Sequence, residues 1–326
     1  MLGRDGRLVA CVVIVACMML TGFGAPGWAP FARSLPAGLA REVVPNRVMT
    51  WNLCNPCGAS NVDQAAEIAA YAPQVIGVQE ACAGDVERIR KYLKSLYGLV
   101  YHVAYGPVLR NWGRCGGVPW KPGAYGQAIL SAAPMTDRAT VEYPDGGSED
   151  RGYLAVTTEV GGRSVRVFNT HFAERRQETV RADQARVLAA AVAEHDHAIV
   201  IGDFNAVPDA PELKALWKLA EDADPRCRPS TAHLCEPSTD WHSRFDYVFL
   251  RGVVSLGQGV RPTAHSDHHL VYADLDLAGP CAQASGSMHL CRLANAHRRF
   301  GLRLRPARRH SPSRAPARPG LWCANW

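Results

Sequence analysis

The feature that most constrains this 326-residue chain is a series of short apolar segments with polar residues at their ends. Residues 48–51, 75–78 and 199–202 are segments of this kind, with the length and composition of buried β-strands. The polar residues in or directly beyond such segments are Asn52, Glu80, Asn169, His171, Asp203, Asn205, Asp246, Asp267 and His268. Strand ends converge at one edge of a sheet, where α/β folds commonly bind ligands. The sequence therefore predicts one cleft that combines carboxylates, amides and two histidines.

Helical spacing of apolar residues separates these strands. The spacing predicts helices over residues 65–71, 85–96, 177–194 and 211–219. Further strands are predicted over residues 99–103, 127–131, 153–160, 164–169, 245–250 and 270–277. Alternation of strands and helices is typical of α/β folds. The Gly- and Pro-rich stretch 112–123, which contains Trp112 and Trp120, is predicted to be a long loop.

Six short strings recur in a characteristic order. They are Thr50-Trp51-Asn52, Val78-Gln79-Glu80, Asn169-Thr170-His171, Gly202-Asp203-Phe204-Asn205, Phe245-Asp246-Tyr247 and Ser266-Asp267-His268. In this order they resemble the endonuclease/exonuclease/phosphatase superfamily, which has the fold of deoxyribonuclease I. The resemblance spans about residues 46 to 277. It implies a four-layer α/β sandwich, with two central and mostly antiparallel sheets flanked by helices, and a divalent-metal-dependent phosphoesterase.

The resemblance also implies roles for the polar residues. Glu80 is expected to be the principal ligand of Mg²⁺ or Mn²⁺, with Asn52 and Asp267 nearby, because a hard cation prefers oxygen ligands. His268 is expected to be the general base, and Asp246 is expected to orient its imidazole.

The remaining site residues are expected to handle the phosphoryl group. Asp203 and Asn205 would position the attacking water or bind phosphoryl oxygens. His171 would stabilise the developing charge or protonate the leaving group, and Asn169 would support the site. Two further positions that the resemblance places at the site are Arg151, as a phosphate contact, and Tyr125, as a cleft residue. The chain departs from many family members at Gln127, where they have Asn.

Sequence composition divides the chain into four parts. Residues 1–29 are predicted to be a signal peptide, because Arg4 and Arg7 precede an apolar run that small residues follow. An uncleaved anchor and lipidation at Cys17 are the alternatives. Residues 30–45 form a lead-in segment, and residues 46–278 form the endonuclease/exonuclease/phosphatase domain. Residues 279–326 hold nine Arg and no Asp, Glu or Lys, which predicts a disordered basic tail.

The cysteines agree with export. Six lie in the predicted domain, at Cys54, Cys57, Cys82, Cys115, Cys227 and Cys235. An even set in an exported protein predicts three disulfides, with a zinc site or free thiols as alternatives. We expect Cys227 to pair with Cys235 across a short Pro-containing loop. If Asn52 and Glu80 face one metal ion, Cys82 is expected to bridge to Cys54 or Cys57, and the other of these two to reach Cys115.

The substrate is less constrained than the chemistry. Residues 30–278 are mildly acidic, so the domain lacks a broad basic footprint for nucleic acid. Local Arg and Lys residues still allow phosphate contacts. We expect a secreted, monomeric nuclease that acts on DNA or RNA and needs no protein partner. The alternatives are a sphingomyelinase-like phospholipid phosphodiesterase whose Trp112 and Trp120 contact a membrane, a small-molecule phosphatase of the inositol phosphate type, and an inactive scaffold.

Overall fold

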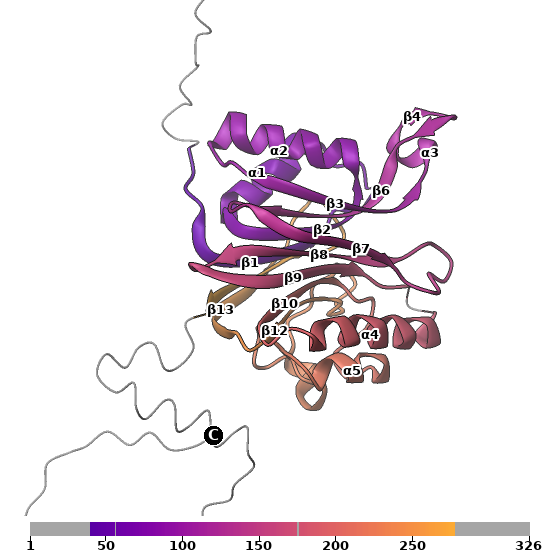
Figure 1. The fold of residues 1–326 in the computed structure, drawn as a ribbon, viewed down its shortest axis with the longest axis vertical. Coiled ribbons are helices and arrows are strands. Elements are labelled where there is room, and N and C mark those ends of the chain that lie inside the picture. The colour runs from indigo at the N-terminus through magenta and orange to yellow at the C-terminus, as the bar shows by residue number, and fades with distance from the viewer. Residues whose placement is uncertain (1–39, 56, 175, 278–326) are drawn as a thin grey trace, which may run out of the picture.

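The structure, a computed structural model, describes residues 40–277 except residues 56 and 175. The predicted signal peptide, residues 30–39 of the lead-in and the predicted basic tail lie outside the described residues. Two sheets pack face to face, and helices cover the outer face of each sheet (Figure 1). This arrangement confirms the predicted four-layer α/β sandwich.

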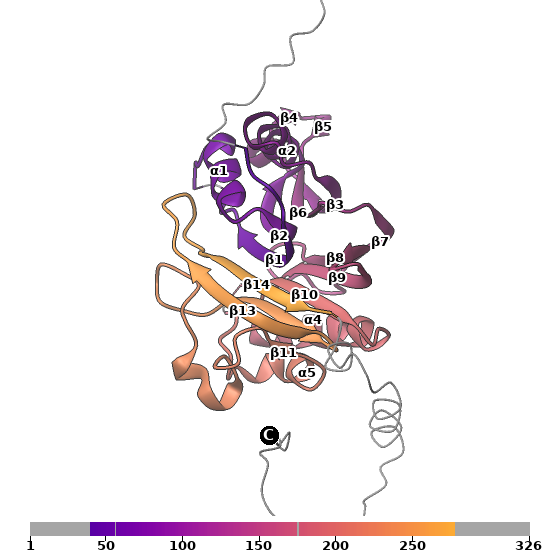
Figure 2. The same ribbon diagram turned by 90° about the vertical axis from the view of Figure 1, so that its left-hand side faces the viewer.

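The first sheet has six strands. In spatial order they are β13 (Val254–Arg261), β14 (Leu270–Asp276), β1 (Val44–Asn52), β2 (Pro73–Cys82), β6 (Ala124–Ser131) and β3 (His102–Arg110). Only the β1–β2 pair is parallel. The β13–β14 pair closes one side of this sheet (Figure 2).

The second sheet repeats this plan. Its order is β11 (Glu221–Asp222), β12 (Asp246–Arg251), β10 (Ala198–Asp203), β9 (Arg163–His171), β8 (Gly152–Val160) and β7 (Met135–Glu142). Only β9 and β10 run parallel. Each sheet therefore contains one parallel pair, and the carboxyl ends of the two pairs meet at a shared edge of the sandwich.

The helices pack by their apolar faces. The first sheet carries α1 (Asn61–Tyr71) and α2 (Ala83–Tyr97), and the second carries α4 (Glu178–Ala193), η1 (Pro211–Leu213) and α5 (Lys214–Trp217). In α2, Val86, Ile89 and Leu93 are buried at the spacing of one helix face. None of the helices among the described residues is long and apolar enough to cross a bilayer.

Aliphatic residues from both sheets fill the space between them, and two further clusters lie beneath the helices. The sheets approach closely at Gly77 in β2. A Cβ atom there would lie 2.6 Å from the Ile201 side chain of β10 and 2.8 Å from Asn169 of β9. This contact brings the two parallel pairs together, and it fixes the relative position of the strand ends that form the site.

Some predicted elements were wrong in place or extent. The strand predicted at 99–103 is displaced, because β3 starts only at His102. The apolar residues that suggested the earlier start, Leu99 and Tyr101, belong to the segment before β3 and bury their side chains in the cluster beneath α1 and α2. The predicted loop 112–123 contains a short helix, α3 (Trp112–Cys115), and two paired strands, β4 (Gly117–Val118) and β5 (Lys121–Pro122). The helix predicted at 211–219 is split into η1 and α5.

Candidate active site

A cleft of about 560 Å³ lies where the strand ends of both sheets meet. The predicted site residues that line it are Glu80, Tyr125, Arg151, His171, Asp203, Asn205, Asp267 and His268. Asn52 and Asp246 are fully buried directly behind this lining, and each is hydrogen-bonded to a residue that lines the cleft. The fold thus gathers residues that lie far apart in the sequence.

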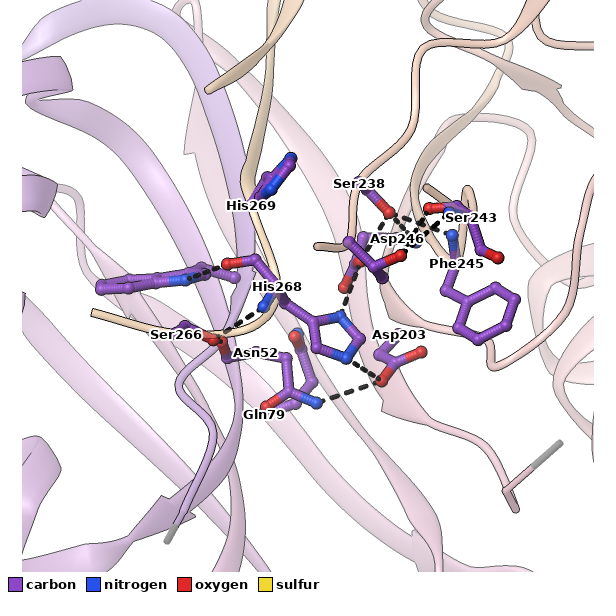
Figure 3. Close-up of polar contacts among 12 residues, drawn as sticks. Asn52, Gln79, Asp203, Ser238, Ser243, Phe245, Asp246, Ser266, His268 and His269 are labelled. Carbon is purple, nitrogen blue, oxygen red and sulfur yellow. Dashed lines mark hydrogen bonds and ion pairs between the residues drawn. The ribbon is translucent and has the colours of Figure 1, made fainter. Parts of the chain in front are cut away.

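His268 and Asp246 form a hydrogen-bonded pair across the two sheets. The Nδ1 atom of His268 donates to Oδ2 of Asp246 at 2.9 Å, which directs Nε2 into the cleft toward Asp203 (Figure 3). Ser238 holds the same Asp246 oxygen through a 2.7 Å hydrogen bond. The backbone of His268 is held by the Trp51 indole N–H, which donates to its carbonyl at 3.1 Å. The imidazole is therefore fixed in orientation before any substrate binds.

The charges around His268 keep it protonated in the metal-free protein. Burial lowers the pKa of His268, but the carboxylates of Asp246 and Asp203 outweigh burial and raise that pKa to about 10. Burial also raises the pKa of Asp203, and the charge on His268 partly offsets this. Between His268 and Asp203, we place the proton on His268. The reason is that His268 Nδ1 is hydrogen-bonded to Asp246, whose carboxylate is fully buried.

Asn52 joins the carboxylates of the two sheets. Its Nδ2 donates to Asp203 Oδ2 at 3.0 Å and to Glu80 Oε1 at 3.2 Å. Its Oδ1 accepts the Cys54 N–H at 2.9 Å. In this structure the Asn52 amide thus presents its NH₂ group to the carboxylates and its oxygen to the backbone of Cys54.

Glu80 is aimed into the cleft by an irregularity in β2. The register between β2 and β6 shifts between Val78 and Ala81, so one extra residue is inserted in β2. Glu80 has a φ of 51°, in the left-handed region that non-glycine residues rarely adopt. A bulge of this type re-aims a side chain next to an active site. Burial raises the pKa of the Glu80 carboxyl, and the hydrogen bond from Asn52 only partly offsets this.

These residues fit a hard divalent cation. Glu80 and Asp267 line the same cleft with carboxylate oxygens, and burial makes an uncompensated charge on Glu80 unfavourable. Asp203, Asp246 and His268 also place ligand atoms within 4.8 Å of one another, but His268 and Asp246 are bonded to each other. A second grouping, Asp267 with Cys54 and Cys57, is excluded because both sulfurs form a disulfide. Glu80 is therefore the best centre for a cation.

A neutral histidine, His171, and an arginine, Arg151, line the cleft from the second sheet, opposite the His268–Asp246 pair. Arg151 Nη1 donates to His171 Nδ1 at 2.9 Å, which leaves the His171 proton on Nε2. Burial, with the nearby charge of Arg151, lowers the pKa of His171 well below its usual value. Nε2 lies 3.3 Å from Asp203 Oδ2 and 3.1 Å from Asn205 Nδ2. His171 is thus suited to donate a hydrogen bond as a neutral imidazole.

Asn169 does not line the cleft. It lies between the sheets, where its Nδ2 donates to the carbonyls of Val78 and Ala128 and its Oδ1 accepts from Gln79 at 2.6 Å. Gln127 has a similar position, since its Nε2 donates to the Gly152 carbonyl of β8 at 2.9 Å. Both amides therefore join the two sheets behind the site and act as positioning residues.

Sequence reasoning missed four residues that shape the site. Glu149 forms ion pairs with Arg151 and with Arg114, which enters the cleft from α3. The Arg114 guanidinium lies 4.4 Å from the centre of the Tyr125 ring. Trp241 packs edge-on against His268, with 5.3 Å between ring centres, and Ser238 holds Asp246. All four lie in loops or the short α3 helix, so no strand pattern marks them.

The disulfide pattern corrects one prediction and confirms another. Cys82 pairs with Cys115, and Cys54 pairs with Cys57, so the predicted bridge from Cys82 to Cys54 or Cys57 is wrong. The reason is local, because the Cys57 N–H donates to the Cys54 carbonyl and closes a turn that places these cysteines together. Cys227 pairs with Cys235 as predicted.

The chain belongs to the endonuclease/exonuclease/phosphatase family. The model of that family matches residues 49–268, which include all six sequence strings. Members of this family are metal-dependent hydrolases of phosphoester bonds, and the chain is an enzyme of this kind. No curated protein matches the sequence.

Solved structures show the same fold. An endonuclease/exonuclease/phosphatase from Beutenbergia cavernae is 24% identical, with a TM-score of 0.59 over 71% of each chain. TDP2 of D. rerio, complexed with a single-stranded DNA product, is 18% identical, with a TM-score of 0.55 over 71% of this chain and 98% of that one. The mannosyl-6-phosphatase Bt3783 of Bacteroides thetaiotaomicron is 15% identical, with a TM-score of 0.54 over 71% of this chain and 99% of that one.

Proposed function

We propose that this enzyme is an exported, Mg²⁺- or Mn²⁺-dependent nuclease that hydrolyses phosphodiester bonds. The main support for the proposal is the His268–Asp246 pair. Asp246 holds Nδ1 of the imidazole, and Nε2 faces Asp203 in a cleft that also contains Glu80 and Arg151. A positioned base, a centre for a cation and a fixed arginine are the parts that in-line phosphoester hydrolysis requires.

The residues divide the reaction between them. His268 Nε2 takes a proton from the attacking water, while Asp246 holds the imidazole and stabilises its positive charge. Asp203 and Asn205 orient that water and the phosphoryl group. When bound at Glu80, a divalent cation supplies positive charge that neutralises the phosphoester and the nearby carboxylates. Such a cation would offset the negative charge that raises the pKa of His268, and so would bring that pKa closer to neutral pH.

The second sheet stabilises the charge that develops. Neutral His171 donates from Nε2 toward a phosphoryl oxygen or the leaving oxygen, because Arg151 occupies Nδ1. Arg151 itself is 8% exposed and is held by Glu149 at 2.9 Å, so its guanidinium is fixed at the edge of the cleft. A rigid arginine is well suited to contact phosphate oxygens.

A nucleic acid is the substrate class that the surroundings favour. A second arginine, Arg114, enters the cleft beside Arg151, so consecutive phosphates have two cationic contacts. The TDP2 neighbour is described with a single-stranded DNA product, which supports the same class. The phosphatase neighbour Bt3783 makes a small phosphomonoester the main competitor.

One panel of substrates tests this proposal. Purified enzyme with Mg²⁺ or Mn²⁺ is incubated with plasmid DNA, single-stranded DNA, RNA, sphingomyelin, inositol phosphates and mannose 6-phosphate. We expect cleavage of nucleic acid that EDTA abolishes, and loss of cleavage in His268→Ala. Turnover of a lipid or sugar phosphate without cleavage of any nucleic acid would reject the nuclease assignment. Full activity in a chelated sample would reject the role of the cation.

Export is part of the proposal and rests on different features. All six cysteines among the described residues form disulfides, which persist in oxidising compartments. The predicted signal peptide gives the route. Expression in a bacterial host should place the processed protein outside the cytoplasm, with a new N-terminus near residues 24–29 by mass spectrometry. An unprocessed cytoplasmic product would contradict export and leave the proposed chemistry untouched.

A further inference from the structure

Residues 110–123 form a small projecting ribbon that starts at Arg110, the last residue of β3, and otherwise lies outside both six-stranded sheets. The ribbon consists of α3 and the β4–β5 pair, and it extends beyond the end of β6 (Figures 1 and 2). Backbone hydrogen bonds close its base, because Asn111 N–H donates to the Gly123 carbonyl and Gly123 N–H to the Gly116 carbonyl. No residue between 110 and 123 is buried. The ribbon therefore adds nothing to the hydrophobic core.

The ribbon nevertheless displays large apolar side chains. Trp120 is 84% exposed, the highest value for any large hydrophobic residue among those described, and Trp112 is 59% exposed. Val118 between them is 37% exposed. Exposed tryptophans that gather on one small element indicate a contact surface, because burying an indole against a partner is strongly favourable.

The charge of the ribbon is entirely positive. It contains Arg110, Arg114 and Lys121 and no Asp or Glu. Arg114 is paired with Glu149, whereas Arg110 and Lys121 are exposed and form no ion pair within the described part of the chain. This differs from the mildly acidic domain around it. Alternating aromatic and basic side chains match the needs of single-stranded nucleic acid, in which bases stack and phosphates need cations.

The ribbon is also joined to the catalytic cleft. The Cys82–Cys115 disulfide links it to the end of β2, two residues beyond Glu80. Arg114 reaches from the same short helix into the cleft, where it packs on Tyr125. A strand of nucleic acid that leaves the cleft past Arg114 therefore meets the ribbon next.

We propose that the 110–123 ribbon is a second binding surface, which holds single-stranded nucleic acid beside the cleft. Trp112 and Trp120 stack on unpaired bases, and Arg110 and Lys121 contact the adjoining phosphates. The inference rests on the proposed nuclease function and extends it to a preference for single strands. A membrane is the less suitable partner, because the ribbon contains no Leu, Ile or Phe to enter a lipid layer and its basic residues alternate with the tryptophans.

Binding measured without turnover tests the surface. Fluorescence anisotropy of a labelled single-stranded oligonucleotide in EDTA compares the full-length enzyme with a Trp112→Ala/Trp120→Ala double variant. We expect the Kd of the double variant to rise about 30-fold or more, from the typical effect of losing two stacking side chains. Hydrolysis of bis(p-nitrophenyl) phosphate should stay unchanged. Tyr92→Ala, which removes a 37% exposed aromatic side chain on α2, is the matched control and should bind normally.

Two more variants sharpen the test. A Trp112→Phe/Trp120→Phe variant keeps stacking faces and should recover most of the affinity. An Arg110→Ala/Lys121→Ala variant should lower the slope of log Kd against log salt by about 1.4, because each single-strand phosphate contact contributes about 0.7. An unchanged salt slope would remove Arg110 and Lys121 from the interface.

The outcomes separate this inference from the proposed function. If the Trp112→Ala/Trp120→Ala variant binds and cleaves oligonucleotides as the unaltered enzyme does, the ribbon surface is rejected and the nuclease function stands. If that variant loses affinity for lipid vesicles but not for oligonucleotides, the surface binds membranes and the inference is wrong. If the enzyme binds oligonucleotides through the ribbon but cleaves no nucleic acid, only the proposed function fails.

Discussion

The two sheets contribute different halves of the catalytic cleft. The first sheet and its loops supply Glu80, Asp267 and His268, which are the groups proposed to hold the cation and accept the proton. The second supplies Asp246, which orients the proposed base, and Arg151, which lines the cleft and is proposed to contact the phosphoryl group. At the cleft, the hydrogen bonds from His268 to Asp246 and from Asn52 to Asp203 connect the two halves. Neither sheet alone carries a working site.

The halves also differ in how the backbone presents these groups. In the second sheet, His171 and Asp203 lie at the ends of regular neighbouring strands that pair with each other in register. In the first sheet, Glu80 lies on a bulge with left-handed backbone, and His268 lies in a loop held by Ser266. Regular strands are therefore sufficient to position His171 and Asp203, whereas Asn205, just beyond β10, also has a left-handed backbone with a φ of 50°. The base and the cation centre require irregular backbone that the rest of the fold must hold in place.

Loss of the proposed base, His268, should have the largest effect on catalysis. His268→Ala removes the general base, so we expect kcat to fall by about 10²–10⁴-fold with the fold intact. The matched control is His269→Ala, because His269 is the next residue but pairs with Asp240 and not with Asp246. Steady-state kinetics with nucleic acid measures both variants. Equal rates for the two would show that His268 is not the base.

Loss of the cation centre should have the next largest effect. Glu80→Gln keeps the size of the side chain but removes its charge. We therefore expect the Mg²⁺ or Mn²⁺ concentration for half-maximal activity to rise by at least about 10–100-fold, which is the typical effect of losing a residue that only supports a metal ligand. Glu159→Gln, an exposed position on β8, is the control. Metal titration of activity, with calorimetry of Mn²⁺ binding as a second measurement, decides the point. If Glu80→Gln has an unchanged metal requirement, the cation is not bound by Glu80 of the first sheet.

The cross-sheet pair should also determine how stability depends on pH in the metal-free protein. The folded pKa of His268 is about 10, compared with an ordinary value of 6.5. Because the folded value is the higher one, protonated His268 stabilises the fold fully below pH 6.5, and this contribution is lost as the pH rises through 10. We expect the free energy of unfolding in EDTA to decrease over that window.

Asp246→Asn should flatten that decrease, because it removes a charge that raises the pKa of His268. Denaturant unfolding at a series of pH values measures the slope, and NMR titration of the imidazole assigns it. The same slope in the variant would locate the titrating group elsewhere.

These contrasts explain what sequence could predict. Residues at regular strand ends, such as His171 and Asp203, were recognised because an apolar strand followed by a polar residue is a local pattern. The bulge at Glu80 depends on pairing with β6, which no local pattern records. The edge strands β7 and β13 were missed because their exposed residues break the apolar strand pattern, as Asp137 and Arg138 do in β7.

The non-strand parts of the site were also beyond local patterns. Arg114, Glu149 and Trp241 reach the cleft from separate segments, and only the closed fold brings them together. Asn169 has the sequence position of a site residue, yet the close approach of the sheets places it between them. The partner of Cys82 was predicted wrongly in part for the same reason, because the position of Cys115 depends on the ribbon.

The two disulfides near the cleft should differ in their effect, which is the smallest difference we expect to measure. The Cys82–Cys115 bridge closes a loop with a sequence separation of 33 residues, and Cys54–Cys57 closes one of only 3. Because stabilisation in the loop-entropy account grows with loop length, Cys82→Ser/Cys115→Ser should lose about 4 kcal/mol and Cys54→Ser/Cys57→Ser about 2 kcal/mol. Denaturant unfolding at fixed pH measures both variants. Only the first should also weaken oligonucleotide binding, because it frees the ribbon from the end of β2. Equal losses of stability would mean that native-state strain, and not loop closure, sets the contribution of each bridge.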